Sequence, residues 1–266
     1  MKLFDSHAHY FDKRLDEIGG ADVVLRNEVF GGCVERVINV GTNNQNNILC
    51  IEQASRYEGM YAAVGIHPED ADFAKLDVEK EISVLADIIG DKATKREKKI
   101  VALGEIGLDY HFEGLDKALQ ADFFHAQMKL ASELDIPVII HDRDAHGDCF
   151  ETVLKYPSVR GVFHSYSGSA EMASELIKRG WYISFSGVAT FKNASRVREV
   201  ISRIPTERLL IETDAPYLAP HPHRGKVNHS GLMKYTAEAI AEVKGITPER
   251  LSEITYDNAS ELFEII

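Results

Sequence analysis

The chain has 266 residues, of which 44% are hydrophobic and 27% are charged, as in an ordinary globular protein. No apolar stretch approaches the roughly 20 residues that a membrane helix needs, so we expect no membrane-spanning segment. The formal net charge of -12 argues against a protein that coats nucleic acid with a basic surface. It does not exclude an enzyme that meets a nucleic-acid end at a metal site, because bound divalent ions reverse the local field.

The cysteines and the first residues of the chain bear on its compartment. Cys33, Cys50 and Cys149 are odd in number, scattered, and form no CxxC pattern. Such cysteines are typical of a reducing compartment, where they act as small buried hydrophobic residues. The chain begins without the architecture of a signal peptide. We therefore expect a cytoplasmic protein that does not bind a membrane.

Strand-like and helix-like segments alternate along the chain. The predicted strands include near-continuous apolar runs, which are typical of strands buried on both faces. They span Lys2–Asp5, Val34–Val40, Tyr61–Gly65, Ile100–Gly104, Pro137–His141, Gly161–His164, Tyr182–Phe185 and Leu209–Glu212. The predicted helices span Ile48–Glu58, Val78–Ile89, Lys117–Leu134, Ala170–Arg179, Ala194–Ile204, Leu232–Lys244 and Pro248–Phe263. The charged segment Asp91–Lys99 is predicted to be a solvated loop.

This alternation predicts the fold class. Strand and helix alternate about eight times, at a mean of roughly 33 residues per unit. This number and length of repeats are typical of a (β/α)8 TIM barrel of the α/β class. A doubly wound sheet is the rival fold, but it usually has fewer strands and a glycine-rich first turn. No linker, charge block or low-complexity segment divides the chain. We therefore predict a single barrel domain over residues 1–266.

The segment Asp5–His9 follows the first predicted strand and carries two histidines in i, i+2 spacing. Side chains two residues apart in a strand point to the same side, so the imidazoles of His7 and His9 should project together. Paired imidazoles at a strand end make a good divalent-metal site.

Further candidate ligands stand at or just past the ends of other predicted strands. The C-terminal strand ends of a (β/α)8 barrel meet on one face, where active sites are built. The candidates there are Glu105, His141, His164 and Asp214. Each has a simpler explanation, since a strand-end histidine can bond a loop carbonyl and an aspartate can cap a helix. Because all of these explanations would have to hold together, the sequence predicts a metal centre.

The number of ligands favours two divalent ions. His7, His9, Glu105 and Asp214 can surround one ion, and the two oxygens of Glu105 can bridge to a second ion held by His141 and His164. Two ions ~3.5–4 Å apart stabilise both the attacking and the leaving oxygen of a displacement at phosphorus. A divalent ion lowers the pKa of a bound water, and Asp214 can take the proton of that water.

The residues described so far resemble the TatD-type deoxyribonucleases, a family of metal-dependent hydrolases of the amidohydrolase-like barrel class. The resemblance covers essentially the full length. It rests on Asp5–His9, Gly65–Pro68, Gly104–Tyr110, His141–Arg143, His164–Gly168 and Glu212–Leu218. It implies metal ligation by the six residues His7, His9, Glu105, His141, His164 and Asp214. It also implies hydrolysis of DNA from its ends, often from the 3′ end, with Mg²⁺ in use, whereas histidine-rich ligation by itself favours Zn²⁺, Mn²⁺ or Ni²⁺.

Four residues are candidate substrate contacts. Arg143 could hold a phosphate by a bidentate contact, or it could pair with Asp142 or Asp144. His67 could contact the scissile phosphate, or it could be a packed turn residue before Pro68.

The other two candidates lie in the segment after the last predicted strand. Arg224 could follow a nucleic-acid backbone, or it could be an exposed loop charge. Asn228 belongs to a segment in which the family often has Arg and then Asn-x-Pro. Here His229 and Ser230 stand where the proline is expected, which affects substrate preference.

Three more residues are assigned supporting or optional roles. Glu212 is expected to hydrogen-bond a ligating histidine. Tyr110 and Tyr166 could stack on a base, or they could be core or rim aromatic residues.

Two other functions fit the same pattern. A related barrel hydrolase could cleave a carbonyl bond, such as a D-aminoacyl-tRNA ester or an amide, because fold does not separate these reactions. The fourth strand end offers Glu105 and no lysine to carboxylate, which counts against the dinuclear amidase type. A barrel that binds nucleic acid or protein without catalysis is the third alternative. An intact ligand set argues against it, because binding alone needs no open metal site.

Overall fold

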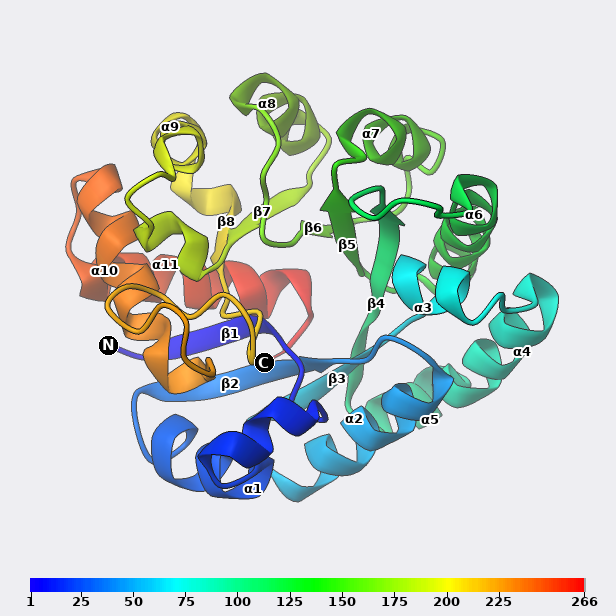
Figure 1. Cartoon of the computed structure of the whole chain (residues 1–266), viewed down its shortest axis with the longest axis horizontal. Coiled ribbons are helices and arrows are strands. Elements are labelled where there is room, and N and C mark those ends of the chain that lie inside the picture. Colours follow the sequence, from blue (N-terminus) through cyan, green and yellow to red (C-terminus); the bar gives the residue numbers. More distant parts are fainter. Residues whose placement is uncertain (266) are drawn as a thin grey trace. The chain divides into compact units, whose positions relative to one another are not determined.

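The computed structural model describes residues 1–265, in which strands alternate with helices (Figure 1). The strands are β1 (Leu3–Ala8), β2 (Val34–Val40), β3 (Met60–Val64), β4 (Ile100–Asp109), β5 (Val138–Arg143), β6 (Gly161–Phe163), β7 (Tyr182–Phe185) and β8 (Leu209–Ile211). The helices are α1 (Ala21–Val24), α2 (Asn44–Arg56), α3 (Pro68–Phe73), α4 (Val78–Ile89), α5 (Lys92–Glu97), α6 (Lys117–Leu134), α7 (His146–Leu154), α8 (Ala170–Lys178), α9 (Ser195–Arg203), α10 (Met233–Lys244) and α11 (Pro248–Leu262). The order of strands in the sheet follows the chain from β1 to β8. This order and alternation confirm the predicted (β/α)8 fold class.

The chain divides into two compact units. The first unit comprises Met1–Asn39 and the chain from His164 onward, and the second comprises Val40–Phe163. The single domain over residues 1–266 remains a prediction.

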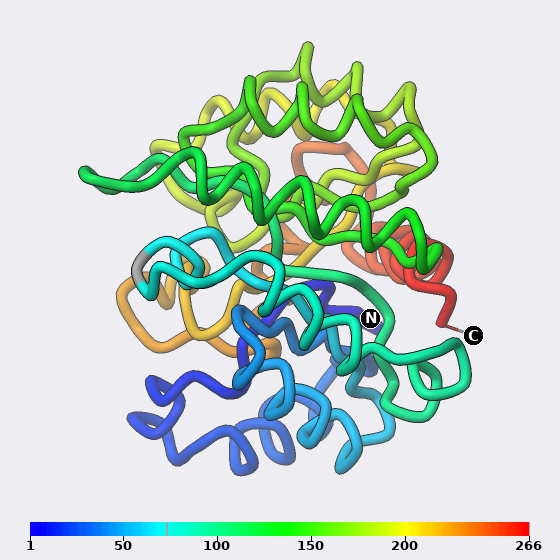
Figure 2. The backbone as a smooth tube through the Cα atoms, turned by 90° about the vertical axis from the view of Figure 1, so that its right-hand side faces the viewer, coloured from blue at the N-terminus to red at the C-terminus, as the bar shows by residue number. Residues whose placement is uncertain are grey.

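In the first unit, β1 pairs with β2 and β7 pairs with β8, both in parallel. The end of β1 also meets the chain after β8, where Ala8 and Ala215 form a parallel bridge. Two backbone hydrogen bonds lie beside this bridge, from His9 N to Ala215 O at 2.7 Å and from Asp214 N to His7 O at 2.9 Å. The fold therefore places the predicted ligands of β1 and β8 side by side. Helix α11 packs against β1, and in Figure 2 the red α11 lies close to the N-terminal end of the chain.

In the second unit, β3, β4, β5 and β6 pair in parallel in chain order. Strand β4 extends past the predicted end at Gly104 and pairs with β5 as far as Asp109 and Arg143. Close pairing depends on Gly107, because a Cβ atom there would lie 2.0 Å from the carbonyl oxygen of His141. The absence of a Cβ atom at Gly107 thus allows β4 to lie close against β5, the strand that carries His141.

Two buried glutamines of α6 secure the strand ends of the second unit. The side chain of Gln127 accepts a hydrogen bond from Ile66 N at 2.8 Å and donates one to Ile66 O at 3.0 Å. The Gln120 side chain accepts from Asp109 N at 3.0 Å. Satisfied buried amides of this kind fix the backbone around them. They hold the segments after β3 and at the end of β4 in place.

Most predicted elements are present, and Val78–Ile89 and Lys117–Leu134 are helical over the predicted ranges. The prediction of a loop over Asp91–Lys99 was wrong, because Lys92–Glu97 forms the short helix α5. The side chain of Asp91 accepts a hydrogen bond from Thr94 N at 2.9 Å and so caps this helix. Helix α7 was not predicted from the apolar pattern.

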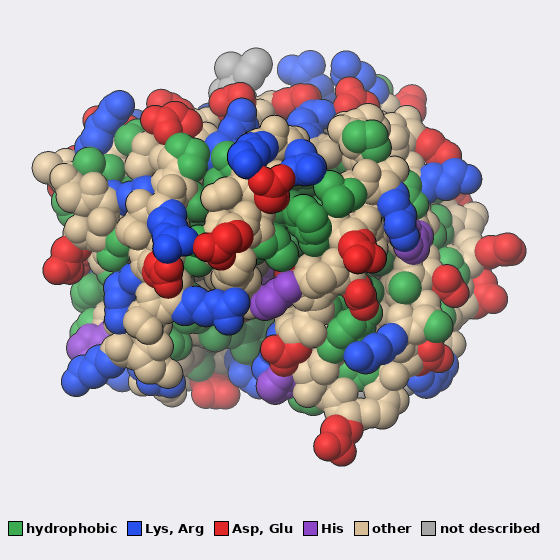
Figure 3. Space-filling view, turned by 90° about the horizontal axis from the view of Figure 1, so that it is seen from above, with side chains coloured by type: hydrophobic (Ala, Val, Ile, Leu, Met, Phe, Trp, Pro, Cys, Tyr) green, Lys and Arg blue, Asp and Glu red, His purple; other side chains and the backbone are tan. Residues whose placement is uncertain are grey.

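The helices, the surface charges and the cysteines agree with what the composition indicated. None of the described helices combines the length and apolarity needed to cross a membrane. Basic and acidic side chains are interspersed over the face seen in Figure 3. Cys50 and Cys149 are buried free thiols, as expected for small hydrophobic residues.

Candidate metal centre

The first unit gathers His7, His9 and Asp214 at the ends of β1 and β8. The Nε2 atoms of the two histidines lie 3.1 Å apart. Asp214 Oδ1 lies 3.8 Å from His7 Nε2 and 3.5 Å from His9 Nε2. Two imidazole nitrogens and a carboxylate oxygen that converge on one point form the donor set of a divalent ion such as Zn²⁺. The predicted projection of both imidazoles to one side is confirmed.

His164 and Glu212 belong to the same unit and extend this group. The His164 ring stacks on His7, with ring centroids 4.0 Å apart and planes 13° apart. Its Nδ1 atom lies 3.2 Å from Glu212 Oε1, which also accepts a hydrogen bond from Ser165 N at 2.8 Å. The predicted contact between Glu212 and a candidate ligand is thus confirmed. A carboxylate on one ring nitrogen fixes the orientation of the ring and raises its basicity.

Asp5 connects the two segments of the first unit that carry the candidate ligands. It is fully buried. Its carboxylate accepts hydrogen bonds from His7 N at 3.2 Å, from Thr213 N at 3.0 Å and from the Thr213 hydroxyl at 2.5 Å. Burial, opposed by these hydrogen bonds, raises the pKa of Asp5 to about 7. Asp5 therefore joins the strand that carries the histidines to the segment that carries Asp214.

The second unit gathers His141, Glu105, Asp109 and His67. His141 Nδ1 lies 2.6 Å from Glu105 Oε1, and His141 Nε2 lies 2.9 Å from Asp109 Oδ2. His67 Nε2 lies 3.8 Å from the same Glu105 oxygen. Because both ring nitrogens of His141 face carboxylates, the surroundings favour a positive charge there. Either a second proton or a metal ion on one nitrogen can supply that charge.

Two aspartates in these groups have lowered pKa values. For Asp214, burial raises the pKa, but the hydrogen bond with His9 and the electrostatic influence of the neighbouring His7 and His164 rings outweigh burial. For Asp109, burial is likewise outweighed by the hydrogen bond with His141 and by neighbouring positive charge. Both aspartates are therefore ionised at neutral pH, as a metal ligand or a proton acceptor must be.

The predicted substrate contacts His67 and Arg143 lie in the second unit. His67 Nδ1 accepts a hydrogen bond from Glu69 N at 3.1 Å, so the residue caps α3 while its other nitrogen faces Glu105. Arg143 is half-exposed and lies 4.0 Å from Asp109 Oδ2. The alternative pairs of Arg143 with Asp142 and Asp144 are not formed. These two carboxylates instead contact His146 at 2.8 Å and His111 at 3.0 Å, respectively.

Arg224 and Asn228 lie in the segment after β8. Arg224 is exposed, and its guanidinium lies 4.4 Å from the centroid of the Phe191 ring. Asn228 is fully buried, and its amide donates to Thr213 O at 2.9 Å and to Tyr217 O at 2.6 Å. The structure thus places Asn228 inside the segment, where its amide holds two backbone carbonyls, and its role in substrate binding stays a prediction.

Comparisons with known proteins decide the family. The family model described as "TatD related DNase" matches residues 4–264. The chain belongs to this family. A relative from Bacillus subtilis (strain 168), the uncharacterized metal-dependent hydrolase YabD, is 42% identical over 270 residues, with 99% of each chain covered. Another, the uncharacterized metal-dependent hydrolase TatD of Mycobacterium tuberculosis, is 32% identical over 272 residues and covers 98% of this chain and 97% of its own.

A solved structure supports the same assignment. The TatD homologue YJJV from Escherichia coli K12 matches with a TM-score of 0.88 and 26% identity, over 99% of this chain and 98% of that chain. As a TatD family member, the protein belongs to the metal-dependent hydrolases. The metal-dependent character agrees with the histidine and carboxylate groups of both units.

Asp109 contacts the candidate ligand His141 but was not predicted from the sequence. Alternate residues of a strand line one face, so Glu105, Gly107 and Asp109 share a face of β4. The spacing of two acidic residues around a glycine could therefore have predicted that Asp109 lies beside Glu105. The prediction would have needed β4 to continue to Asp109, which the apolar pattern alone did not show.

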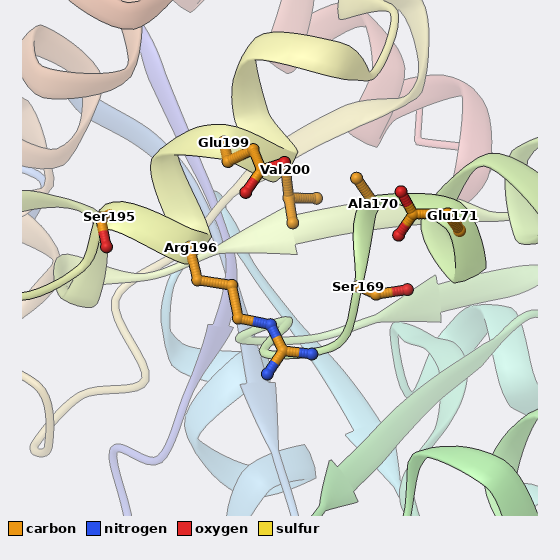
Figure 4. A pocket seen from close by; sticks show the side chains of 7 residues that line it. All are labelled: Ser169, Ala170, Glu171, Ser195, Arg196, Glu199 and Val200. Atoms are coloured by element: carbon orange, nitrogen blue, oxygen red, sulfur yellow. The ribbon is translucent and has the colours of Figure 1, made fainter.

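A pocket lies apart from the predicted ligands of the TatD site, between the N-terminal ends of α8 and α9 (Figure 4). It has a volume of about 380 Å³. Its lining residues are Ser169, Ala170, Glu171, Ser195, Arg196, Glu199 and Val200. The two glutamates that line the pocket, Glu171 and Glu199, each form an ion pair with Arg203 at 2.9 Å. Because none of the predicted site residues lines it, this pocket is not the candidate metal centre.

Proposed function

We propose that the protein hydrolyses phosphodiester bonds of DNA with water activated by divalent ions, removing nucleotides from the 3′ end. The observation that carries the proposal is the pair of histidine–carboxylate groups, one in each unit. The first is His7, His9 and Asp214, and the second is His141 with Glu105. The description of the matching family as DNases supports DNA as the substrate.

The residues present fit divalent ions. The donor set consists of imidazole nitrogens and carboxylate oxygens, which suits Zn²⁺, Mn²⁺ and Mg²⁺ in different degrees. A buried oxygen of Glu212, Oε2, has no hydrogen-bond partner within residues 1–265. A buried carboxylate oxygen without a donor beside it is stabilised by a nearby cation. We assign His7, His9, His164 and Asp214 to ion binding in the first unit, and His141 to ion binding in the second.

We assign Glu105 to ion binding as well, where its two carboxylate oxygens would hold one ion each. The carboxyl ends of all strands of a (β/α)8 barrel meet on one face, and Glu105 lies in the second half of β4. One of its oxygens already contacts His141, and a carboxylate has two oxygens to share. Two divalent ions would supply Lewis acidity for both the attacking water and the leaving oxygen.

The protein side chains then have separate tasks. Asp214, held ionised by the surrounding imidazoles, accepts the proton of the attacking water. Glu212 fixes the His164 ring, and Asp109 fixes the His141 ring, each through one ring nitrogen. His67 and Arg143 lie on the Glu105 side, where they can hold the phosphate.

Removal of metal is the direct test of this proposal. Hydrolysis of an end-labelled oligodeoxynucleotide should vanish when the protein is stripped with a chelator. It should return when Mg²⁺, Mn²⁺ or Zn²⁺ is added back. The measurement is product release alongside elemental analysis of the same samples. Full activity in a sample verified to be metal-free would rule out the mechanism. Cleavage of aminoacyl-tRNA in place of DNA would favour the carbonyl-bond alternative.

Two arginines are expected to hold substrate phosphate. Replacing Arg143 or Arg224 with alanine should weaken binding of DNA by about 1–3 kcal/mol, the range for hydrogen bonds to charged groups. The fold should survive, because both side chains are largely exposed. KM for a DNA oligonucleotide and the melting temperature are measured together.

Arg250 offers a matched control for these two variants. It is exposed on α11 and pairs locally with Glu253 at 3.0 Å. Arg250→Ala removes the same charge from the protein and should leave KM unchanged. If Arg143→Ala and Arg224→Ala resemble this control, both residues are surface charges without a substrate contact.

A further inference from the structure

Tyr217 is an exposed aromatic residue beside the metal-binding group of the first unit. It lies three residues after Asp214 and is 37% exposed. Its ring centroid lies 6.3 Å from that of His9, and the two planes meet at 74°. The geometry thus leaves an aromatic ring accessible to solvent next to a proposed metal ligand.

The ring of Tyr217 is held rigidly in this exposed position. Its hydroxyl donates a hydrogen bond to Asp12 Oδ2 at 2.6 Å. The guanidinium of Arg14 lies over the ring, 4.6 Å from its centroid. The backbone N–H of Tyr217 donates a hydrogen bond to Asp214 O at 2.8 Å. A ring fixed in advance loses little conformational freedom when a ligand binds to it.

The contacts of Tyr217 point to its ring, and not its hydroxyl, as the functional part. Burial and the carboxylate of Asp12 raise the pKa of the hydroxyl, so it stays protonated and is committed to Asp12. Of the two tyrosines singled out in the sequence, Tyr166 is buried, with its hydroxyl donating to Ser169 O. Tyr110 lies in the second unit and has contacts of the same kind as Tyr217, because its hydroxyl donates to Asp148 at 2.8 Å and the ammonium of Lys117 lies over its ring at 3.9 Å.

We propose that the ring of Tyr217 is a platform on which a nucleobase of the substrate stacks, beside the bond that is cleaved. The proposal rests on the proposed hydrolysis of DNA and adds the group that the protein recognises next to the phosphate. Every base has a π face, so stacking on tyrosine holds a nucleotide without reading its sequence. Arg14, behind the ring, adds positive charge where the strand passes.

A purely structural role makes different predictions. The hydrogen bond between Tyr217 and Asp12 joins the segments that follow β8 and β1, and this link could be the whole function of the residue. Tyr217→Phe removes the link and keeps the ring, whereas Tyr217→Leu removes both. Asp12→Asn weakens the link from the other side and leaves the ring untouched. The three variants separate the ring from the hydrogen bond.

The experiment compares two substrates of equal length and charge. One is a thymidine oligonucleotide, and the other carries tetrahydrofuran residues in place of every nucleoside, so that it has phosphates but no bases. Tyr217→Leu should lower kcat/KM on the first substrate by about 5- to 150-fold, the range for losing one stacked base. Its effect on the second substrate should be negligible. Asp12→Asn should match the wild-type protein on both substrates, and Tyr217→Phe, which keeps the ring, should lose much less kcat/KM on the thymidine substrate than Tyr217→Leu does.

Other outcomes decide against the proposal. Equal loss on both substrates, or a loss in Tyr217→Phe as large as in Tyr217→Leu, would show that Tyr217 only ties the two segments together. Unchanged kcat/KM in Tyr217→Leu on the thymidine substrate would overturn stacking while leaving the proposed DNA hydrolysis intact.

Failure of the proposed function is recognised separately, in the wild-type protein. If it cleaves neither substrate with any divalent ion, DNA hydrolysis is wrong. Fluorescence anisotropy then compares binding of the same two oligonucleotides. A preference for the base-containing strand that is lost in Tyr217→Leu would still support stacking, and its absence would refute it.

Discussion

Replacing Asp214 with asparagine is expected to lower turnover by about 100-fold or more, the effect of losing general-base assistance, while at least one metal ion stays bound. Asparagine keeps the size of the side chain and one metal-binding oxygen but cannot accept the proton. The backbone of Asp214 is left-handed, with φ at 56°. Asparagine tolerates this conformation as well as aspartate does, so the variant should fold.

The measurement for Asp214→Asn is single-turnover cleavage together with metal stoichiometry. Asp91→Asn is a matched control, because it removes one carboxylate from an exposed helix cap and asparagine also caps helices well. The control should keep wild-type turnover. Near-normal turnover in Asp214→Asn would refute its assignment as the base. Loss of all bound metal would instead make Asp214 chiefly a ligand.

The strands were predictable because both faces of a parallel barrel strand are buried and read as apolar runs. The same signal ended two of the strands that carry candidate ligands, β1 and β4, too early. Strand β1 continues through the polar residues Ser6 and His7 to Ala8, and β4 continues through Glu105 to Asp109. An apolar pattern stops where functional side chains begin, so it places the end of the strand too early.

The residue types of the site could be predicted, but many of their partners could not. The sequence places His141 and Arg143 at a strand end, yet the carboxylate that both approach, Asp109, lies far back along the chain. The roles of Asn228 and Tyr217 depend on the path of the segment after β8, which has no periodicity to read. Such contacts are set by tertiary packing, so only the folded chain reveals them.

Removing the carboxylate of Glu105 is expected to affect metal binding itself, in contrast to Asp214→Asn. Glu105 is buried, and its Oε1 atom lies 2.6 Å from His141 and 3.8 Å from His67. Glu105→Ala deletes both oxygens, so it removes the proposed bridge and leaves two imidazoles without their shared anion. We expect the number of bound ions to fall from two toward one, and hydrolysis to fall with it.

The metal content of Glu105→Ala is compared with that of a variant that keeps Glu105 and changes only a neighbour of His141. Asp109→Asn keeps Glu105 and weakens the support of His141, so metal affinity should fall by about 10- to 100-fold while both ions bind at saturation. A Glu105→Ala protein that binds two ions fully would refute the bridge. If it instead keeps one ion at wild-type affinity and releases the other, the retained ion belongs to the group of His7, His9 and Asp214, and the released one depended on Glu105.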